Sequence, residues 1–266
     1  MRRLRRFLRI LPILLPAALV GLSSAPQTEA PVFLGERLVF AMTILGIAGG
    51  ELTLSAENTE LAGKPMYKFE LSALSNDFLS KFFLVREYLV SWVDPATFRS
   101  VRFEKHSVEG RRVRDEETEF DYESDTVRID GVPRPLMDAT LDTLSSVYYL
   151  RTVSLSSHEK PIELRVVSRE IDTVRIDVQA KEAVTTPAGV FRTIRVEPKS
   201  EGTHLLGKNL VLWLTDDDRR VPVQLKSKLK VGTLFGKLKS IERVSSPTTT
   251  ESRSPTPARP ISASGC

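Results

Sequence analysis

The chain has 266 residues with a formal net charge of +4, of which 41% are hydrophobic and 27% charged, and it contains a single cysteine. Five arginines among the first nine residues supply the positive excess, because 33 basic side chains remain against 34 acidic ones without them. A basic surface for nucleic acid is therefore not supported, and a single cysteine excludes a disulfide within the chain.

The start of the chain has the layout of an export signal. Residues 2–9 contain five arginines, and residues 10–22 form an apolar run that is short for a membrane span and is interrupted by Pro12 and Pro16. We expect residues 1–24 to be a cleaved signal peptide, with an uncleaved anchor as the alternative. The mature chain would then be periplasmic, with no transmembrane span left after removal of the signal.

Alternating apolar residues predict a first group of β-strands within residues 33–131. The stretch from Asn76 to Leu84 breaks this alternation, because Phe78 and Phe82 lie four residues apart after a suitable cap residue. We interpret it as a short helical turn with excess apolar surface. It would act either as a lid over an apolar pocket or as a plug that closes the core.

The stretch 138–151 is the one strong helix pattern of the mature chain. Its apolar residues recur at the 3.6-residue period, and Asp138 and Thr140 offer oxygens to cap the first turn. Before it, Pro133 and Pro135 each remove an amide donor, so the segment 132–135 is expected to continue neither a strand nor a helix.

A second group of strands is predicted within residues 160–244, with its clearest hairpin at Pro187 to Gly189. Together the two groups predict one mainly β domain over 33–244, a strongly curved antiparallel sheet or incomplete barrel with the helix on its concave side. A two-sheet sandwich is the alternative. The Ser/Thr/Pro-rich tail 245–266 has the composition of a disordered segment and ends in Cys266.

Five motifs in the same order resemble a known family. They are Gly35-Glu36 with Leu38 and Phe40, the turn Gly46-Ile-Ala-Gly49, Asp142 to Arg151, Thr186 to Phe191, and Trp213 to Val223. Over residues 34–244 this order resembles the domain of unknown function 3108, a family of exported bacterial proteins. The resemblance implies export and a β-rich fold but no activity. The architecture is also similar to that of periplasmic lipoprotein carriers, whose curved sheets hold acyl chains.

No reaction site stands out among the polar residues. His106, His158 and His204 lie about fifty residues apart without ligands at metal-site spacing, so we expect no metal, no cofactor and no catalytic residue. The aspartates 216–218 are interpreted as a charged hairpin tip. The candidate ligand-binding residues are two aromatic ones in the helical turn and a polar group at the mouth of the concave face, namely Phe78, Phe82, Asp142, Arg151 and Trp213.

These features favour a non-enzymatic periplasmic protein that binds an apolar or amphipathic envelope ligand, a lipid or a polymer, between the sheet and its helix. An envelope scaffold or protein-interaction module is the first alternative, and it predicts an exposed apolar patch or an unpaired strand edge. An envelope hydrolase using Asp142 or Asp217 with His204 is the less favoured one. No nucleic-acid partner is expected.

Overall fold

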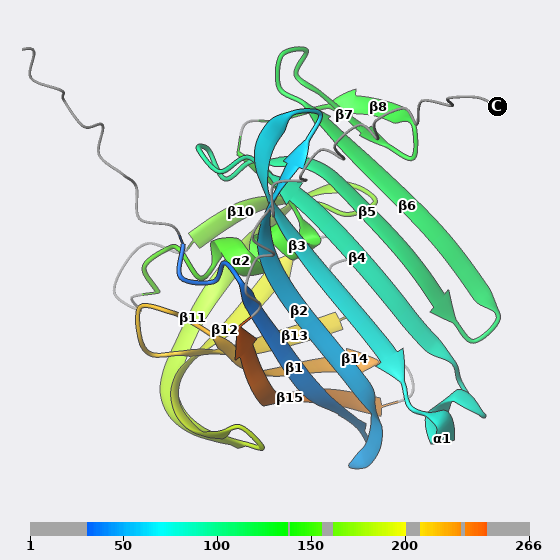
Figure 1. The fold of residues 1–266 in the computed structure, drawn as a ribbon, viewed down its shortest axis with the longest axis vertical. Coiled ribbons are helices and arrows are strands. Elements are labelled where there is room, and N and C mark those ends of the chain that lie inside the picture. The colour runs from blue at the N-terminus through cyan, green and yellow to red at the C-terminus, as the bar shows by residue number, and fades with distance from the viewer. Residues whose placement is uncertain (1–30, 138, 156–161, 201–207, 230–231, 244–266) are drawn as a thin grey trace, which may run out of the picture. The chain divides into compact units, whose positions relative to one another are not determined.

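The computed structural model describes residues 31–137, 139–155, 162–200, 208–229 and 232–243 (Figure 1). The signal peptide predicted over 1–24, the tail 245–266 with Cys266, and two of the three histidines, His158 and His204, lie outside these residues. Neither of the two described helices has the length and hydropathy of a membrane-crossing segment.

The described part of the chain is mainly β and contains fifteen strands and two short helices. In chain order the elements are β1 (Glu36–Ile44), β2 (Ile47–Leu61), β3 (Lys64–Ser75), α1 (Asp77–Ser80), β4 (Val85–Val93), β5 (Ser100–Glu109), β6 (Arg112–Asp121), β7 (Thr126–Ile129), β8 (Val132–Pro135), β9 (Thr140–Asp142), α2 (Thr143–Tyr149), β10 (Ile162–Val167), β11 (Ile171–Thr186), β12 (Gly189–Ser200), β13 (Lys208–Thr215), β14 (Pro222–Leu229) and β15 (Gly232–Arg243).

All the described strands belong to one sheet, in the order β8-β7-β6-β5-β4-β3-β2-β1-β15-β14-β13-β12-β11-β10-β9. In the middle of this order β1, the first strand along the chain, pairs with β15, the last one. The strands at the two ends of the sheet are β8 and β9. The sheet is therefore not closed into a barrel. This confirms the predicted curved antiparallel sheet or incomplete barrel and excludes the two-sheet sandwich.

The helix α2 joins the two halves from the concave side of the sheet. It contacts β3 and β4 of the first half and β9 and β10 of the second, and Figure 1 shows it beside β3 and β10. Leu144 and Tyr148 pack into a large core cluster with side chains of β1 to β7 and of β10, β11 and β13 to β15, whereas Leu141 and Leu150, which flank the helix, belong to a second cluster with β10 to β14. One short element thus covers apolar surface from both halves.

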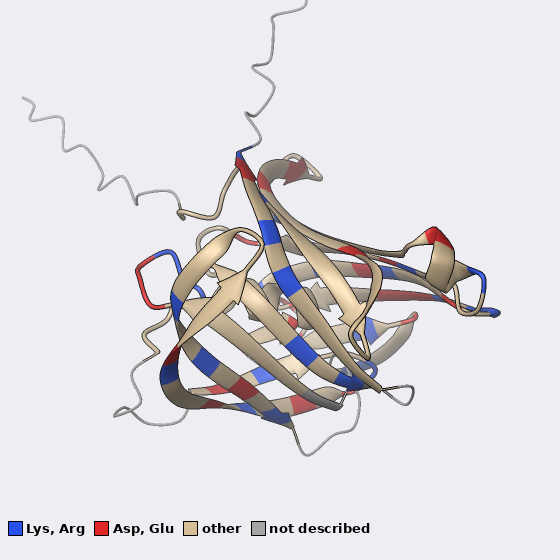
Figure 2. Cartoon of the chain, turned by 90° about the horizontal axis from the view of Figure 1, so that it is seen from below, with Lys and Arg blue, Asp and Glu red and all other residues tan. Residues whose placement is uncertain are grey.

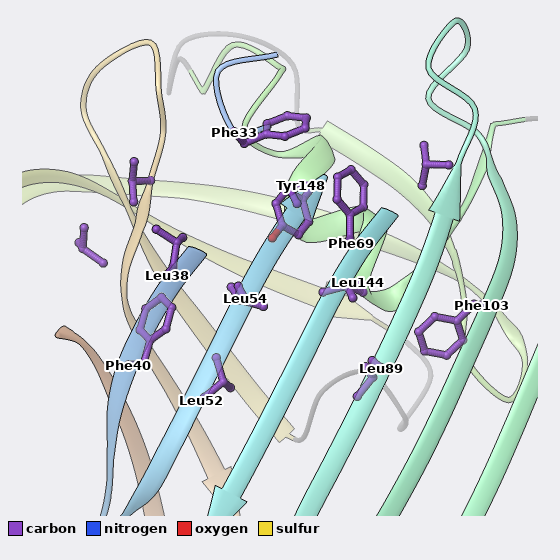
Figure 3. Packing of buried hydrophobic residues seen from close by; sticks show 14 of the residues in the cluster. Phe33, Leu38, Phe40, Leu52, Leu54, Phe69, Leu89, Phe103, Leu144 and Tyr148 are labelled. Carbon is purple, nitrogen blue, oxygen red and sulfur yellow. The ribbon is translucent and has the colours of Figure 1, made fainter. Parts of the chain in front are cut away.

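Aromatic rings fill the first cluster around this helix (Figure 3). The Tyr148 ring stacks on Phe69 at a centroid distance of 3.9 Å, and Phe33 meets both rings edge-on. The Tyr148 hydroxyl donates a hydrogen bond to the backbone oxygen of Ser55 on β2 at 3.0 Å. Burial raises the pKa of the Tyr148 hydroxyl well above its usual value. These contacts fix α2 against the centre of the first half.

The helix is shorter than its sequence pattern predicted. It begins at Thr143, not near residue 138, and it ends at Tyr149. Thr140, expected as a cap, lies in strand β9, which pairs in parallel with β10. Asp142 is the N-cap residue. Its side chain accepts a hydrogen bond from the backbone amide of Ser145, and the Ser145 hydroxyl accepts one from the backbone amide of Asp142.

The expectation that residues 132–135 cannot form a strand was wrong. They form β8 at one end of the sheet, paired only with β7 among the described strands. The Leu136 amide donates to the Asp125 oxygen at 2.8 Å, so residue 136 faces β7 and, by alternation, Pro133 and Pro135 face away from it. Their nitrogens, which carry no hydrogen, therefore cost no ladder bond. The prolines thereby blunt an exposed edge of the sheet.

Two other local expectations were confirmed. Asn76 caps α1, because its Oδ1 accepts from the Leu79 amide at 2.8 Å. In the hairpin between β11 and β12, Thr186 pairs with Gly189, which has the positive φ of 134° that the turn requires.

A matched pair of glycines tests the described packing of β2 against β3. Gly50 has φ +152°, and a Cβ there would lie 2.0 Å from the Leu74 carbonyl oxygen, whereas a Cβ at Gly63 would meet nothing within 4 Å. We expect Gly50→Ala to lower the free energy of unfolding by about 3 kcal/mol or more, through overpacking. Gly63→Ala pays only for its positive φ, about 1 kcal/mol. Urea denaturation measures both, and equal losses would contradict the described approach.

Candidate functional site

The five predicted ligand-binding residues fall in separate places. Phe78 and Phe82 lie in and after α1 and are 57% and 76% exposed, whereas Asp142, Arg151 and Trp213 are buried. The three buried residues each have their own partners, described below, and none of the described contacts joins one of them to another. The exposed aromatic pair and the buried polar groups therefore have to be considered separately.

The segment with α1 is held by polar contacts at its start. The Asn76 side chain donates from Nδ2 to the Ala48 oxygen at 2.8 Å, which ties it to the β1–β2 turn. Ser75 and Ser80 share a 2.6 Å hydroxyl contact, and the Ser75 hydroxyl also accepts from the Val85 amide at 3.0 Å. Because these hydrogen bonds fix the backbone of the segment, its conformation does not depend on burial of the aromatic side chains.

Phe78 and Phe82 are part of a larger exposed apolar surface at this end of the sheet. Their rings lie 5.5 Å apart, and the exposed fractions of the group run from 44% at Phe83 to 76% at Phe82. We call this group the apolar end, and its members are Leu45, Ile47, Phe78, Phe82 and Phe83. Single exposed apolar residues are ordinary, but several large ones on adjoining turns indicate a contact surface.

Close contacts show that these turns adjoin. Leu79 Cδ2 lies 3.6 Å from the point where a Cβ added at Gly49 would stand, so α1 packs on the start of β2. On its other side, Phe83 Cε2 lies 3.1 Å from the Cβ position of Gly110, in the β5–β6 turn. The segment 76–84 thus bridges the start of β2 and the β5–β6 turn.

Basic side chains lie on one side of the apolar end, after α1 and in the β5–β6 turn. Lys81, Arg86 and Arg111 are exposed, and among the described residues none of them has a carboxylate within ion-pair distance. The acidic residues in the same turns are Asp77 and Glu109. Figure 2 shows basic positions in the loop after α1 and in the neighbouring β5–β6 turn. The surface therefore combines apolar rings with a small excess of positive charge.

Asp142 is fully buried in a hydrogen-bond network that joins α2 to the first half of the sheet. Its Oδ2 accepts from the hydroxyls of Ser91 on β4 and Ser100 on β5, at 2.6 and 2.7 Å. Its Oδ1 accepts from the amides of Leu144 and Ser145, at 2.8 and 2.9 Å. Both carboxylate oxygens are thus satisfied by the fold itself.

The protonation of Asp142 is set mainly by its burial. Desolvation raises the pKa of this carboxyl group above its usual value, while the bonds from Ser91, Ser145 and Ser100 oppose the rise. No cation is among the partners described for it. The network consequently acts as a polar link inside the core, with Asp142 as its centre.

Arg151 follows α2 and makes a buried ion pair with the first strand. Its Nη2 atom lies 2.7 Å from Oε2 of Glu36, and both side chains are 1% exposed. Arg219 Nη2 contacts the other Glu36 carboxylate oxygen at 2.6 Å. The Arg151 guanidinium also lies over the rings of Phe33 and Tyr148, at 5.4 and 5.8 Å. This arginine is therefore occupied by the fold, as a link between α2 and β1.

Trp213 lies on β13 and is 7% exposed. Its indole Nε1 donates to Oε1 of Glu182 at 2.6 Å, and the Arg195 guanidinium lies 5.8 Å from its ring. The residue thus packs between β11, β12 and β13, and its role in ligand binding stays a prediction.

The remaining polar candidates of the sequence have local partners. His106 Nδ1 lies 2.5 Å from Asp115 Oδ1. Asp217 accepts from the backbone amides of Arg219 and Arg220, and Asp216 pairs with Lys181 at 2.8 Å. Within the described residues, no group of three or more His, Cys, Asp or Glu side chains is arranged to hold a metal ion.

The space between α2 and the second half of the sheet is nearly filled. The cavity there has a volume of about 10 Å³ and is lined mainly by apolar side chains of α2 and β10 to β13, among them Val147 and Leu164. This is roughly the space of one water molecule. A cavity of this volume is too small for an acyl chain, and the ligand site expected between sheet and helix stays a prediction.

A wider polar groove lies on the other face of the sheet. It has a volume of about 390 Å³, is open to solvent, and is lined by residues of β4, β5 and β6 and by the β7–β8 turn, among them Tyr88, His106 and Asp130. Its walls are mostly charged, so it does not suit an apolar ligand.

Sequence reasoning found part of the apolar end and missed the rest. Phe78 and Phe82 were recognised because their spacing breaks the strand alternation. Leu45 and Ile47 were not, since apolar residues flanking a glycine turn are equally consistent with a buried hairpin. The partnership of Glu36 with Arg151 spans 115 residues and leaves no local signal.

Comparisons with known proteins identify a family and a fold. A family model described as "Protein of unknown function (DUF3108)" matches residues 39–239. Among solved structures, the chain is similar to a β-barrel-like protein of the domain of unknown function DUF1849 from Brucella abortus, with a TM-score of 0.55 and 10% identity over 78% of this chain and 97% of that one. At this identity the likeness shows the fold alone.

A second solved structure, a "putative lipoprotein" from Parabacteroides distasonis, has a TM-score of 0.30 and 11% identity over 80% of this chain and 97% of that one. A likeness at this score carries no argument. No curated protein matches the chain.

Substitutions at Asp142 test the buried network. Asp142→Ala leaves the amides and hydroxyls around it without an acceptor, so we expect it to lower the free energy of unfolding by about 2–4 kcal/mol. Asp142→Asn keeps an acceptor and removes the buried charge, and we expect a change within about 1 kcal/mol. Urea denaturation of both variants measures the difference.

The same pair gives a pH dependence with a defined sign. Because burial raises the folded-state pKa of Asp142 above the unfolded value of about 3.9, the folded chain binds the extra proton. The stability of the natural chain relative to Asp142→Asn should therefore fall as the pH rises from about 4 through the raised pKa. A relative stability that instead rises with pH would contradict the direction of the shift.

Proposed function

The chain belongs to the DUF3108 family of proteins of unknown function, and we propose that it is an exported, non-catalytic envelope protein that docks on an anionic lipid surface through its apolar end. The observation that carries this proposal is the exposure of Phe78, Phe82 and Phe83 beside Leu45 and Ile47, on turns held by polar contacts. The export signal expected over residues 1–24 supports the compartment.

The chemistry of the apolar end suits the interface of a bilayer. Phenylalanine and leucine side chains gain roughly 1.5–3 kcal/mol each when fully removed from water, so even partial insertion of several of them is favourable. Lys81, Arg86 and Arg111 stand at the rim of the same surface. Near an anionic membrane each such cation contributes about 1 kcal/mol, and its long stem can lie along the apolar region.

Docking at the surface fits the described interior better than carriage of a ligand inside it. The cavity beside α2 has room for about one water, and the polar side chains of Asp142 and Arg151 are bound by the fold. The apolar or amphipathic ligand expected from the sequence is thus placed, in this proposal, outside the sheet and not between the sheet and its helix. The hydrolase alternative relied on His204, which lies outside the described residues.

Vesicle flotation tests the proposed contact. The mature chain is mixed with vesicles of phosphatidylglycerol and phosphatidylethanolamine, and the bound fraction is compared with that for phosphatidylcholine vesicles. We expect binding to the anionic vesicles only, and a loss of at least about tenfold in affinity for Phe78→Ser combined with Phe82→Ser, because both rings are exposed and contribute little to folding.

The matched control is Val190→Ser on the β11–β12 hairpin, where an apolar side chain is 71% exposed and the turn is hydrogen-bonded to Leu238 of β15 and not to α1. It should bind as the natural chain does. Equal binding by the Phe78/Phe82 variant, or no binding to anionic vesicles at all, would overturn the lipid contact. Binding of another envelope protein at the apolar end in place of lipid would support the scaffold alternative.

The compartment has a separate test. Expression of the full chain in a Gram-negative host followed by mass spectrometry of the periplasmic fraction should give a mature protein that starts near residue 25. Recovery of the chain only in the cytoplasm with residues 1–24 attached would contradict export, whatever the vesicle result.

A further inference from the structure

Part of strand β6 is an open edge of the sheet. The strand runs from Arg112 to Asp121 and pairs with β5 along almost its whole length. On its other side β7 pairs only with residues Thr118 to Asp121. Within the described chain, residues 112–116 therefore have a neighbouring strand on one side only.

The backbone groups that face this open side can be assigned from the next residue that is bonded there. The Glu117 amide donates to Asp130 Oδ1 at 2.9 Å, and the Glu117 oxygen accepts from the Asp130 amide at 2.8 Å. The amide and carbonyl of Glu117 thus point away from β5. Because the direction of these groups alternates along a strand, the amides and carbonyls of Val113 and Asp115 point to the same side. Neither has a described partner on that side.

The charges along this open edge change sign at its middle. Arg112 and Arg114 precede Asp115 and Glu116, and the edge carries one exposed apolar residue, Val113, at 58%. A strand that is basic at one end and acidic at the other matches a copy of itself running in the opposite direction. The two ends of the sheet are less suited, because β8 carries two prolines and β9 is buried.

We propose that two copies of this chain associate through this edge, as an antiparallel pair of β6 strands related by a two-fold axis at Arg114. In this register Val113 of each copy faces Asp115 of the other, and these pairs form four backbone hydrogen bonds. Arg112 of each copy faces Glu116 of the other on the same face of the sheet, which adds two cross-strand ion pairs. The sheet then continues from one copy into the next.

We expect this association to be weak. The contact is a short strand edge, well below the area of a stable dimer, and the two Arg114 side chains face each other at the axis with Glu116 of each strand beside them. Glu116 also lies 3.4 Å from Arg169 of the β10–β11 turn, a long contact that leaves it able to meet a second cation. We expect a dimer that forms at high concentration and weakens with salt.

Sedimentation velocity over a range of concentrations, with charge-exchanged variants, tests the register. Arg112→Glu alone places two acidic residues opposite each other, and Glu116→Arg alone places two basic ones, so each variant should stay monomeric at concentrations where the natural chain dimerises. A mixture of the two variants should restore the dimer, because one Arg112–Glu116 pair is then kept and the other is rebuilt with its charges exchanged. Arg134→Glu on β8 is the control for a change of charge alone.

A second variant tests the backbone bonds. Val113→Pro removes an amide that faces the open side and leaves the β5–β6 bonds intact, so it should fold normally and abolish dimerisation. A natural chain that is monomeric at all concentrations would overturn the inference, and so would a dimer that both charge variants keep. A dimer lost in the Phe78/Phe82 variant and kept in Val113→Pro would assign association to the apolar end, which also overturns it. None of these results depends on lipid binding.

Discussion

The buried carboxylate of Asp142 is the link on which the arrangement of the two halves depends. It caps α2 and accepts hydrogen bonds from hydroxyl groups on β4 and β5. It also lies at the end of β9, one of the two edge strands of the sheet. A seven-residue helix is too short to be stable alone, so its place is set by this cap and by the stacking of Tyr148 on Phe69. The far end of the sheet is thereby held against its own concave face.

Much of the fold could be predicted from the sequence, because strand alternation, glycine turns and the Asn76 cap are local signals. The limits of α2 could not. Residues 140–142 fit the helix pattern, but whether they form helix or strand depends on whether a neighbouring strand is available to pair with them. Here they pair with β10 and form strand β9. The prolines of β8 were misjudged for a related reason, since a missing amide is harmless only on the outer side of an edge.

The candidate site was only partly predictable, for a physical reason. Asp142 and Arg151 were selected as polar groups on a helix, yet burial with complete hydrogen bonding makes such groups part of the core. Whether an apolar residue such as Phe82 is covered depends on what else reaches that turn, and the sequence does not contain that distance information. Exposure separates the two cases, and we propose the apolar end and the open edge of β6 as the surfaces that meet partners.

Hydrogen exchange measured by mass spectrometry, with and without anionic vesicles, tests the central claim that the apolar end meets the lipid surface. We expect slower exchange of the amides in residues 44–49 and 76–84, with unchanged exchange in the β11–β12 hairpin around Val190. Unchanged exchange throughout in the presence of saturating vesicles, or protection confined to other parts of the sheet, would contradict it.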